Sequence, residues 1–276
     1  MAFRYEGTVV RPYDFFGLAA TRGEILGTDV ITKFGRNGSV GTSFVPISIG
    51  GVYQTPTSAV SLEFVANLAD ALNGAGMHEL TVQGLDANWL PQTVVTSAHA
   101  TDGSNAVAIS GTWTRVHRAY VSASGTYGTA SAGSHVGDIT IRVAGAGATY
   151  ATIDSTDFPK GQTEIAAFTI PKGYSGYVGN IEITLNKTGS ATCDAVFFSR
   201  PGADDVVSSY SGMRGQKVYS ALQAPFSVPS RYPTGPYIGP CDIGFMAKSS
   251  TGTTSVSVDF DIILQKEDEP SAGEFG

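Results

Sequence analysis

The stretch that decides the fold is Ser255-Val256-Ser257-Val258-Asp259-Phe260-Asp261-Ile262-Ile263-Leu264, in which apolar and polar side chains alternate. Successive side chains of a β-strand point to opposite faces of a sheet, so this period of two predicts one face on a core and one face in water. The same alternation recurs over residues 181–185, 139–143 and 80–82. We therefore predict an all-β protein made of two jelly-roll-like β-sandwich domains.

The composition of the whole chain supports this prediction. Among 276 residues there are 28 Thr, 24 Val and 16 Ile, which makes 68 β-branched residues against 11 Leu. The 34 Gly and 13 Pro together make about 17 % of the chain, and only 15 % of residues are charged. β-branched residues favour strands over helices, and a disordered chain would carry more charge. Helical bundles, coiled coils and disordered chains are therefore disfavoured.

Glycine-rich stretches divide the predicted strands into groups. Residues 122–137 and 145–150 are rich in Gly, Ala and Ser and flank one short strand, so we expect a connector there. The predicted division is an N-terminal β-domain over 1–125, a connector with one short strand over 126–157, a C-terminal β-sandwich over 158–266 and an acidic tail over 267–276.

Shorter signals predict where the chain reverses. Asn37-Gly38, Asn73-Gly74 and Asp102-Gly103 favour turns, because positive φ angles are easily adopted there. Residues 59–72 fit either an apolar helical stripe or a strand. We favour a strand from about Ser58 to Ala66 followed by a loop, since strands surround it and Gly74 would end a helix early.

Aromatic residues near turns and prolines are the candidate contact residues. Five prolines lie between residues 225 and 240, and proline donates no backbone hydrogen bond, so this segment cannot be a central strand. It is either a long loop on its own domain or an aromatic arm that docks on a neighbouring subunit. A tryptophan at a hairpin tip either makes such a contact or folds back over its hairpin. The candidate interface residues are Trp89, Phe226, Tyr232 and Tyr237.

The charge distribution disfavours nucleic acid and membranes as partners. Of the net charge of −7, −3 lies in residues 265–276 and −4 in the rest, and no run of Lys or Arg is present to bind phosphates. No stretch approaches the roughly 18 apolar residues of a membrane span, and the first residues lack an apolar leader. We expect synthesis and folding in the cytoplasm.

No pattern of chemically active residues predicts a catalytic, metal or cofactor site. The four histidines have no metal-ligand spacing, and the two cysteines lie among apolar residues, which predicts buried reduced thiols rather than a bridge. Acidic residues at 154–157 and 204–205 are interpreted as turn residues that bond their own backbone. We predict no catalytic residues, no metal and no cofactor. The histidines and cysteines considered for such sites are His78, His99, His117, His135, Cys193 and Cys241.

Five segments in order resemble a group of minor virion structural proteins of tailed bacteriophages, many from marine phages. They are Gln83–Asp86, Trp113–Val121, Gly137–Ile141, Thr169–Tyr177 and Val256–Leu264. The resemblance covers roughly residues 25 to 265. It implies a non-enzymatic homo-oligomer in the virion, attached to capsid or neck proteins as decoration, fibre or collar. The proline-rich segment around Tyr232–Pro240 and the acidic tail depart from that group.

Two other functions remain open at this point. Trp89, Tyr232 and Tyr237 could stack on sugars in a carbohydrate- or receptor-binding module of a tail fibre. Asp86, Asp102 and Asp154 are nominal candidates for a glycan hydrolase carried on the particle, since two carboxylates flanking a sugar bond can come from anywhere in a fold.

Overall fold

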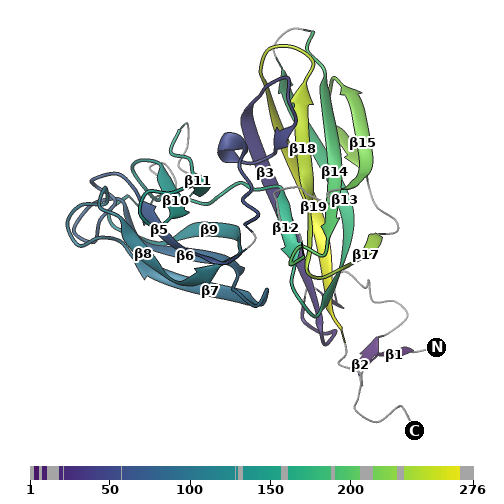
Figure 1. Ribbon diagram of the computed structural model, residues 1–276, viewed down its shortest axis with the longest axis horizontal. Helices are drawn as coiled ribbons and strands as arrows, with labels where there is room; N and C mark the ends of the chain where they lie inside the picture. Colours follow the sequence, from purple (N-terminus) through teal and green to yellow (C-terminus); the bar gives the residue numbers. More distant parts are fainter. Residues whose placement is uncertain are drawn as a thin grey trace.

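The computed structural model confirms an all-β chain whose sheets are antiparallel throughout the described residues. The structure describes residues 3–5, 8–10, 19–20, 22–56, 58–127, 129, 133–156, 161–187, 190–205, 214–228 and 233–267. Figure 1 shows two groups of strands side by side, joined near β3 and β12. A small hairpin, β1 (Phe3–Tyr5) with β2 (Thr8–Val10), lies apart from both groups.

The larger group, here the large sheet pair, consists of two sheets that share one core. One sheet has the order β16 (Phe226–Val228), β13 (Tyr174–Lys187), β19 (Thr254–Lys266), β3 (Thr28–Val40), and β17 (Thr234–Ile238) also pairs with β13. The other has the order β12 (Ala167–Ile170), β18 (Cys241–Ser249), β14 (Cys193–Pro201), β15 (Arg214–Leu222), and β4 (Val45–Pro46) pairs with β18.

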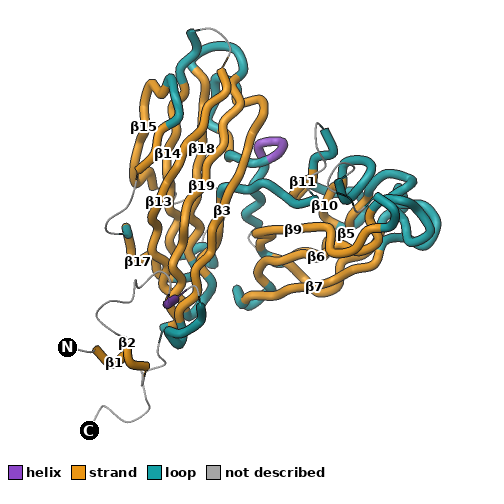
Figure 2. The backbone as a smooth tube through the Cα atoms, turned by 180° about the vertical axis from the view of Figure 1, so that it is seen from behind, coloured by secondary structure: helices purple, strands orange, loops and turns teal. Residues whose placement is uncertain are grey.

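The smaller group, here the small sheet pair, encloses a second core. Its sheets are β11 (Thr149–Ile153), β10 (Ile139–Val143), β5 (Val60–Val65), β8 (Val107–Trp113), and β7 (Pro91–Ser97), β6 (Met77–Leu85), β9 (Arg115–Ser124). Buried side chains from both sheets meet in this core, Phe64 and Trp113 from one and Leu80 from the other. The backbone tube in Figure 2 shows the two groups as separate bodies.

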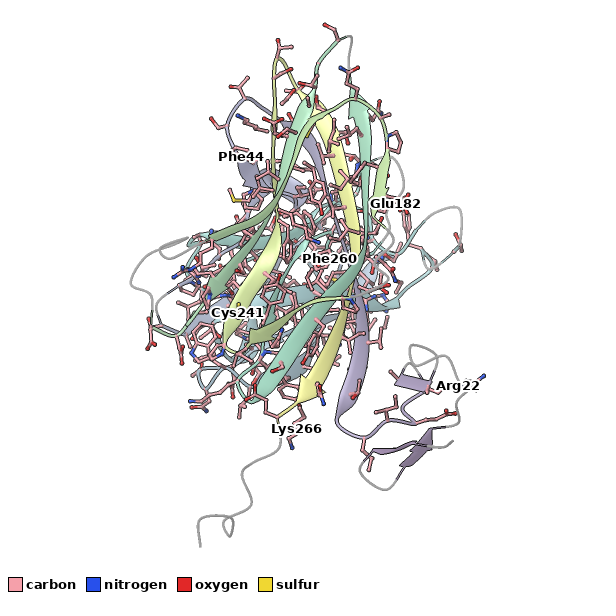
Figure 3. All side chains as sticks on the ribbon, turned by 90° about the vertical axis from the view of Figure 1, so that its right-hand side faces the viewer. Arg22, Phe44, Glu182, Cys241, Phe260 and Lys266 are labelled. Carbon is pink, nitrogen blue, oxygen red and sulfur yellow. The ribbon has the colours of Figure 1, made fainter. Side chains whose placement is uncertain are left out.

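The stretch that opened the sequence analysis is the central strand β19. Its apolar residues Val256, Val258, Phe260 and Ile262 are at most 1 % exposed, and they alternate with residues on the opposite face. Figure 3 places Phe260 between the two sheets of the large pair, where its ring centroid lies 5.3 Å from that of Phe245 on β18. The period of two therefore identified both the strand and its buried face correctly.

The strand pairing differs from the predicted division of the chain. β3 and β4 were predicted in a domain over 1–125, but β3 pairs with β19 and β4 with β18, both in the predicted C-terminal sandwich. The small sheet pair, residues 60–153, is thus inserted between two parts of the large pair. Alternation reveals that a segment is a strand, but it carries no information about partners more than 200 residues away.

The predicted connector over 126–157 also differs from the structure, because it contributes two paired strands, β10 and β11, to the small sheet pair. The Gly145-Ala146 turn between them is anchored by Glu63 of β5. The Glu63 carboxylate accepts hydrogen bonds from the backbone N–H groups of Gly145 and Ala146, both at 3.0 Å, and from Arg142 Nε at 2.8 Å. The Glu63 carboxylate, which is distant in sequence, therefore stabilises a glycine-rich turn for which the sequence alone predicts no defined structure.

The turn predictions met different outcomes. The strand predicted from about Ser58 to Ala66 is present as β5, Val60–Val65, and Asn73-Gly74 and Asp102-Gly103 lie in loops. Asn37-Gly38 was wrongly predicted as a turn: β3 runs straight through it to Val40. Asn37 is only 6 % exposed, and its Nδ2 donates to the Pro46 carbonyl at 3.3 Å. The side chain links β3 to β4 rather than reversing the chain.

Asp70, fully buried in the loop after β5, organises one end of the small sheet pair. Its carboxylate accepts hydrogen bonds from four backbone N–H groups, those of Asn67, Met77, Val136 and Gly137, at 2.9 to 3.3 Å. One side chain therefore holds three separate chain segments together. Such a carboxylate replaces the water that these amides would otherwise need.

The described strands of the proline-rich segment lie on their own sheet pair, at the edge of a sheet. β16 and β17 both pair with β13, opposite the side that pairs with β19. The prediction that prolines keep this segment out of a central strand is confirmed. The peptide bonds Gly235-Pro236 and Gly239-Pro240 are cis.

Candidate functional site

The most distinctive polar feature is a buried ionic cluster where the two sheet pairs meet, here called the junction cluster. Thr169, Asp242 and Arg200 lie in one row across β12, β18 and β14, because Asp242 is in register with both neighbours. Arg115 enters from β9 of the small sheet pair. Its Nε and Nη2 donate to the two oxygens of Asp242 at 2.8 and 2.9 Å, a bidentate pair.

The rest of the cluster satisfies the remaining lone pairs of Asp242. Arg200 Nη2 donates to Oδ2, and Thr169 Oγ1 donates to Oδ1 at 2.5 Å. The Tyr53 hydroxyl lies 2.6 Å from Thr169 Oγ1. Asp242, Arg115 and Arg200 are each at most 1 % exposed. One carboxylate thus faces two guanidinium groups away from water.

Burial and charge act in opposite directions on these groups. Burial alone would raise the pKa of Asp242, but the charges and hydrogen bonds of Arg115 and Arg200 outweigh it and hold the pKa below its usual range. Burial, and then the charge of Asp242, raise the pKa of Tyr53. Asp242 is therefore ionised and Tyr53 neutral over the physiological pH range. The charges of the junction cluster do not change in that range, and they hold the two sheet pairs together.

A second polar contact lies beside the cluster. The buried His117 ring packs on Phe168 with centroids 4.2 Å apart, and its Nε2 accepts a hydrogen bond from the backbone N–H of Thr169 at 3.2 Å. Burial, then the charges of Lys33 and Arg115, lower the pKa of His117 well below its usual value. Lys33 Nζ donates to the His117 carbonyl at 2.6 Å. The prediction of a structural rather than catalytic His117 fits these contacts.

Trp89 also lies at this junction, so it does not project from its hairpin tip. It is 8 % exposed, it clusters with Leu85 and Ala203, and its ring lies 4.8 Å from the Arg115 guanidinium carbon. Its φ of 65° turns the chain back, and its carbonyl accepts from Lys172 N at 3.1 Å. Trp89 is thus a contact between the two sheet pairs of one chain. Its side chain does not project from the hairpin tip as a contact residue for another molecule.

The other candidate interface residues are dispersed. Phe226 is 38 % exposed at the start of β16, and its ring centroid lies 5.5 Å from that of Tyr219. Tyr237 on β17 is half-buried and packs edge-on against Phe197 at 5.8 Å. Tyr232 lies outside the described residues. Trp89 belongs to a different part of the molecule and does not share a surface with Phe226 and Tyr237.

The nominal hydrolase carboxylates are turn residues. Asp86 accepts from Asn88 N and Leu90 N, while the other two each accept from the backbone and hydroxyl groups of the residue two positions later. These two are Asp102 with Ser104 and Asp154 with Thr156. Each carboxylate stabilises its own loop, as the sequence suggested for acidic residues in turns.

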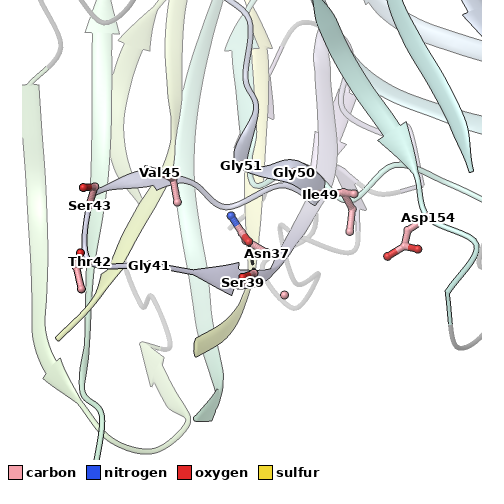
Figure 4. Close-up of a pocket in the computed structure, with 11 residues that line it drawn as sticks. Asn37, Ser39, Gly41, Thr42, Ser43, Val45, Ile49, Gly50, Gly51 and Asp154 are labelled. Carbon is pink, nitrogen blue, oxygen red and sulfur yellow. Dashed lines mark hydrogen bonds between the residues drawn. The ribbon is translucent and has the colours of Figure 1, made fainter. Parts of the chain in front are cut away.

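Figure 4 shows a polar hollow that Asp154, one of these acids, helps to line. It has a volume of about 450 Å³ and is lined mainly by Gly, Ser and Thr of the β3–β4 hairpin, with Asp154 on the far side. Asn37 Oδ1 accepts from Ser39 N at 3.0 Å and shapes its floor. The lining offers hydroxyl and backbone groups and a single carboxylate, which suits weak polar contacts rather than acid–base chemistry.

Both cysteines are buried and unbonded, as predicted, and burial raises the pKa of Cys193 to about 11 and of Cys241 to about 12. Within the described residues, no group of three His, Cys, Asp or Glu side chains has metal-binding geometry. In the same part of the chain, no helix is long and apolar enough to cross a membrane.

Sequence reasoning missed the junction cluster. Arg115 lies in Trp113–Val121, one of the five segments of the resemblance, but Asp242 is 127 positions away from it, and Arg200 is 42 positions away from Asp242. The available signal was a charged residue within an apolar run, Phe197-Phe198-Ser199-Arg200 and Pro240-Cys241-Asp242-Ile243. Charged residues are almost never buried unless paired, so two such runs of opposite sign could have suggested a pair.

Comparisons with known proteins give little further information. No protein-family model matches the chain, and no curated protein matches it in sequence. Solved structures of infectious bursal disease virus show a distant likeness: T=1 particles derived from the virus (11 % identity, 87 % of this chain, 70 % of that chain, TM-score 0.18), the VP2 subviral particle (12 %, 86 %, 76 %, 0.17) and the Gx strain (11 %, 88 %, 78 %, 0.16). These TM-scores lie below the range that indicates a shared fold.

Proposed function

We propose that the chain is a non-enzymatic structural component of a tailed-phage virion, attached to the capsid or the head-to-tail neck as decoration, fibre or collar. The observation that carries this proposal is the ordered resemblance of five segments to such proteins. These segments fall on β6, β8–β9, β10, β12–β13 and β19, strands of both sheet pairs. Two of them supply Arg115 and Thr169 of the junction cluster.

We further propose that the two sheet pairs are two jelly-roll-like β-sandwich domains, one inserted into the other. Domains joined by linkers usually move relative to one another unless their interface is large or specific. Here the Arg115–Asp242 pair, with both side chains at most 1 % exposed, ties β9 to β18. A virion part that transmits contacts between neighbours would benefit from such a fixed orientation.

The expected partners are other copies of the chain and capsid or neck proteins. Only 15 % of residues are charged, and Thr, Ser and Gly are abundant, so many contacts can form with little loss of side-chain entropy. Phe226 is the candidate contact residue that retains substantial exposure, at 38 %. The receptor-binding alternative has less support, because the Trp89 ring is covered.

Quantitative mass spectrometry of purified particles tests the proposal. The chain should co-purify with the virion through a density gradient at a fixed ratio to the major capsid protein. On the order of hundreds of copies would indicate capsid decoration, and about a dozen would indicate a neck ring, since virion parts follow the particle symmetry. Absence from intact particles that contain all other structural proteins would refute the virion role.

A further inference from the structure

A cleft of about 840 Å³ runs along the junction between the two sheet pairs. One wall is the first half of β3, residues 29–34, which is the edge strand of its sheet. The opposite wall comes from residues 83–85 of β6 and 91–93 of β7, and Phe168 and His117 line its depth. Figure 1 shows where these strands face each other. A concave site of this size between two bodies is a common place for a ligand.

Two cations converge on this cleft. Lys33 is only 7 % exposed, and Arg118 on the opposite wall is exposed and held by Gln162, whose Oε1 accepts from Nη2 at 2.9 Å. Among the residues that the structure describes, neither cation forms an ion pair. Among the described residues that line the cleft, Asp29 is the single acid, and it accepts from the N–H of Val30 at 2.8 Å.

The buried amine therefore lacks a compensating anion. Its Nζ has the His117 carbonyl as hydrogen-bond acceptor at 2.6 Å, and His117 itself brings no negative charge. Burial, then the charge of Arg118, lower the pKa of Lys33 to about 7. Burial of a cation costs free energy unless the cation is paired with an anion. An anionic ligand in the cleft would supply the negative charge that the described residues do not place beside Lys33.

The neutral groups in the cleft narrow the class of ligand. Gln83 lies in one cross-strand row between Thr93 and Arg118, so an amide, a hydroxyl and a cation line the same wall. Phe168 and Pro171 add apolar surface. Sugar hydroxyls bond to amides and hydroxyls, sugar C–H faces pack on apolar groups, and a carboxylate pairs with Lys and Arg.

We propose that this cleft binds an acidic saccharide, with the sugar carboxylate between Lys33 and Arg118. Trp89, Phe226 and Tyr237 do not line this cleft, and the proposal does not depend on the virion role. Its charge pattern favours a uronic acid over a neutral sugar, and its hydroxyl and amide groups favour a sugar over a bare carboxylate.

Isothermal titration calorimetry of the full chain with an oligogalacturonate tests this proposal. Controls are a neutral malto-oligosaccharide of the same length and acetate. The oligogalacturonate should bind at least about tenfold more tightly than either, because each charged hydrogen bond adds about 1.5 kcal/mol or more. Arg118→Gln should weaken its binding by about tenfold or more. Lys217→Gln, which removes a cation on β15 outside the cleft, should leave binding unchanged.

Because Lys33 is buried, Lys33→Met is tested together with its thermal unfolding curve, while Arg118→Gln at an exposed position keeps the test independent of folding. No binding of oligogalacturonate at about 10 mM, a range where even weak sites are occupied, would overturn the proposal. Equal binding of the neutral sugar, equal binding of acetate, or an unchanged affinity in folded Arg118→Gln would each overturn it as well.

Discussion

Neutralising Asp242 should lower the free energy of unfolding and should allow the two sheet pairs to unfold independently of each other. Asp242→Asn keeps the size and shape of the side chain but leaves Arg115 and Arg200, which are 0 % and 1 % exposed, without an anion. Removing one partner of a buried ion pair typically costs about 3–5 kcal/mol, because the remaining charge stays desolvated. The bidentate contact at 2.8 and 2.9 Å and the additional bond from Thr169 favour the upper half of that range.

A matched control is Asp194→Asn, which makes the same chemical change on the same sheet. Asp194 contacts Lys248 at 3.5 Å, and the two side chains are 31 % and 38 % exposed. Exposed pairs of this kind contribute about 0–1 kcal/mol, because water and salt screen them. The difference between the two variants therefore measures the consequence of burial rather than of the substitution itself.

Urea unfolding followed by both far-UV circular dichroism and tryptophan fluorescence is the assay. Both tryptophans, Trp89 and Trp113, lie in the small sheet pair or at the junction, whereas circular dichroism reports all strands. In Asp242→Asn the fluorescence and dichroism transitions should no longer coincide, since a junction that is lost uncouples the two cores. An unfolding free energy within about 1 kcal/mol of the Asp194→Asn value, with coincident transitions, would refute the reasoning.

Three further predictions concern single groups. Asp70→Ala leaves four backbone N–H groups without their acceptor and should lower the unfolding free energy by about 3 kcal/mol or more, as measured by urea denaturation; a loss near zero would mean that water replaces the carboxylate. The pKa of Lys33 is about 7 in the folded chain and higher when unfolded, so the unfolded chain binds more protons at this group and wild-type stability should rise between pH 7 and about pH 8, below the range in which the unfolded thiols ionise. Calorimetry should show a smaller rise for Lys33→Met, and equal slopes would contradict this assignment. The pKa values of Cys193 and Cys241, about 11 and 12, predict slow thiol labelling at about pH 8 in native protein and rapid labelling in urea; rapid native labelling would show that these thiols are accessible.

Acidification should also weaken the junction through Asp242. Its folded pKa lies below its unfolded value, so the stabilisation is present above the unfolded pKa, near 4, and is lost as the pH falls through the folded pKa. The variant Asp242→Asn lacks this titration. We therefore expect wild type and variant to converge in stability at acidic pH.

The all-β class, the buried face of β19 and the strand character of β5 could be predicted from the sequence alone. These features depend on side chains two positions apart, and a period of two is visible without knowledge of partners. The buried state of both cysteines and the turn role of Asp154 were likewise local properties. In each case the cause lies within a few residues of the effect.

Only the tertiary structure decided which strands pair and what the junction contains. β3 joins β19 across more than 200 residues, so the predicted boundary at 125 could not anticipate that the small sheet pair is an insertion. Trp89 was predicted at a hairpin tip, either as a contact residue or folded back over the hairpin, and only the tertiary structure shows that it packs against Arg115 and Ala203 from distant segments. The junction cluster likewise joins Arg115, Arg200 and Asp242 from three strands. Such contacts depend on how the two sheet pairs pack against each other. The alternation of apolar and polar residues along one strand contains no information about that packing.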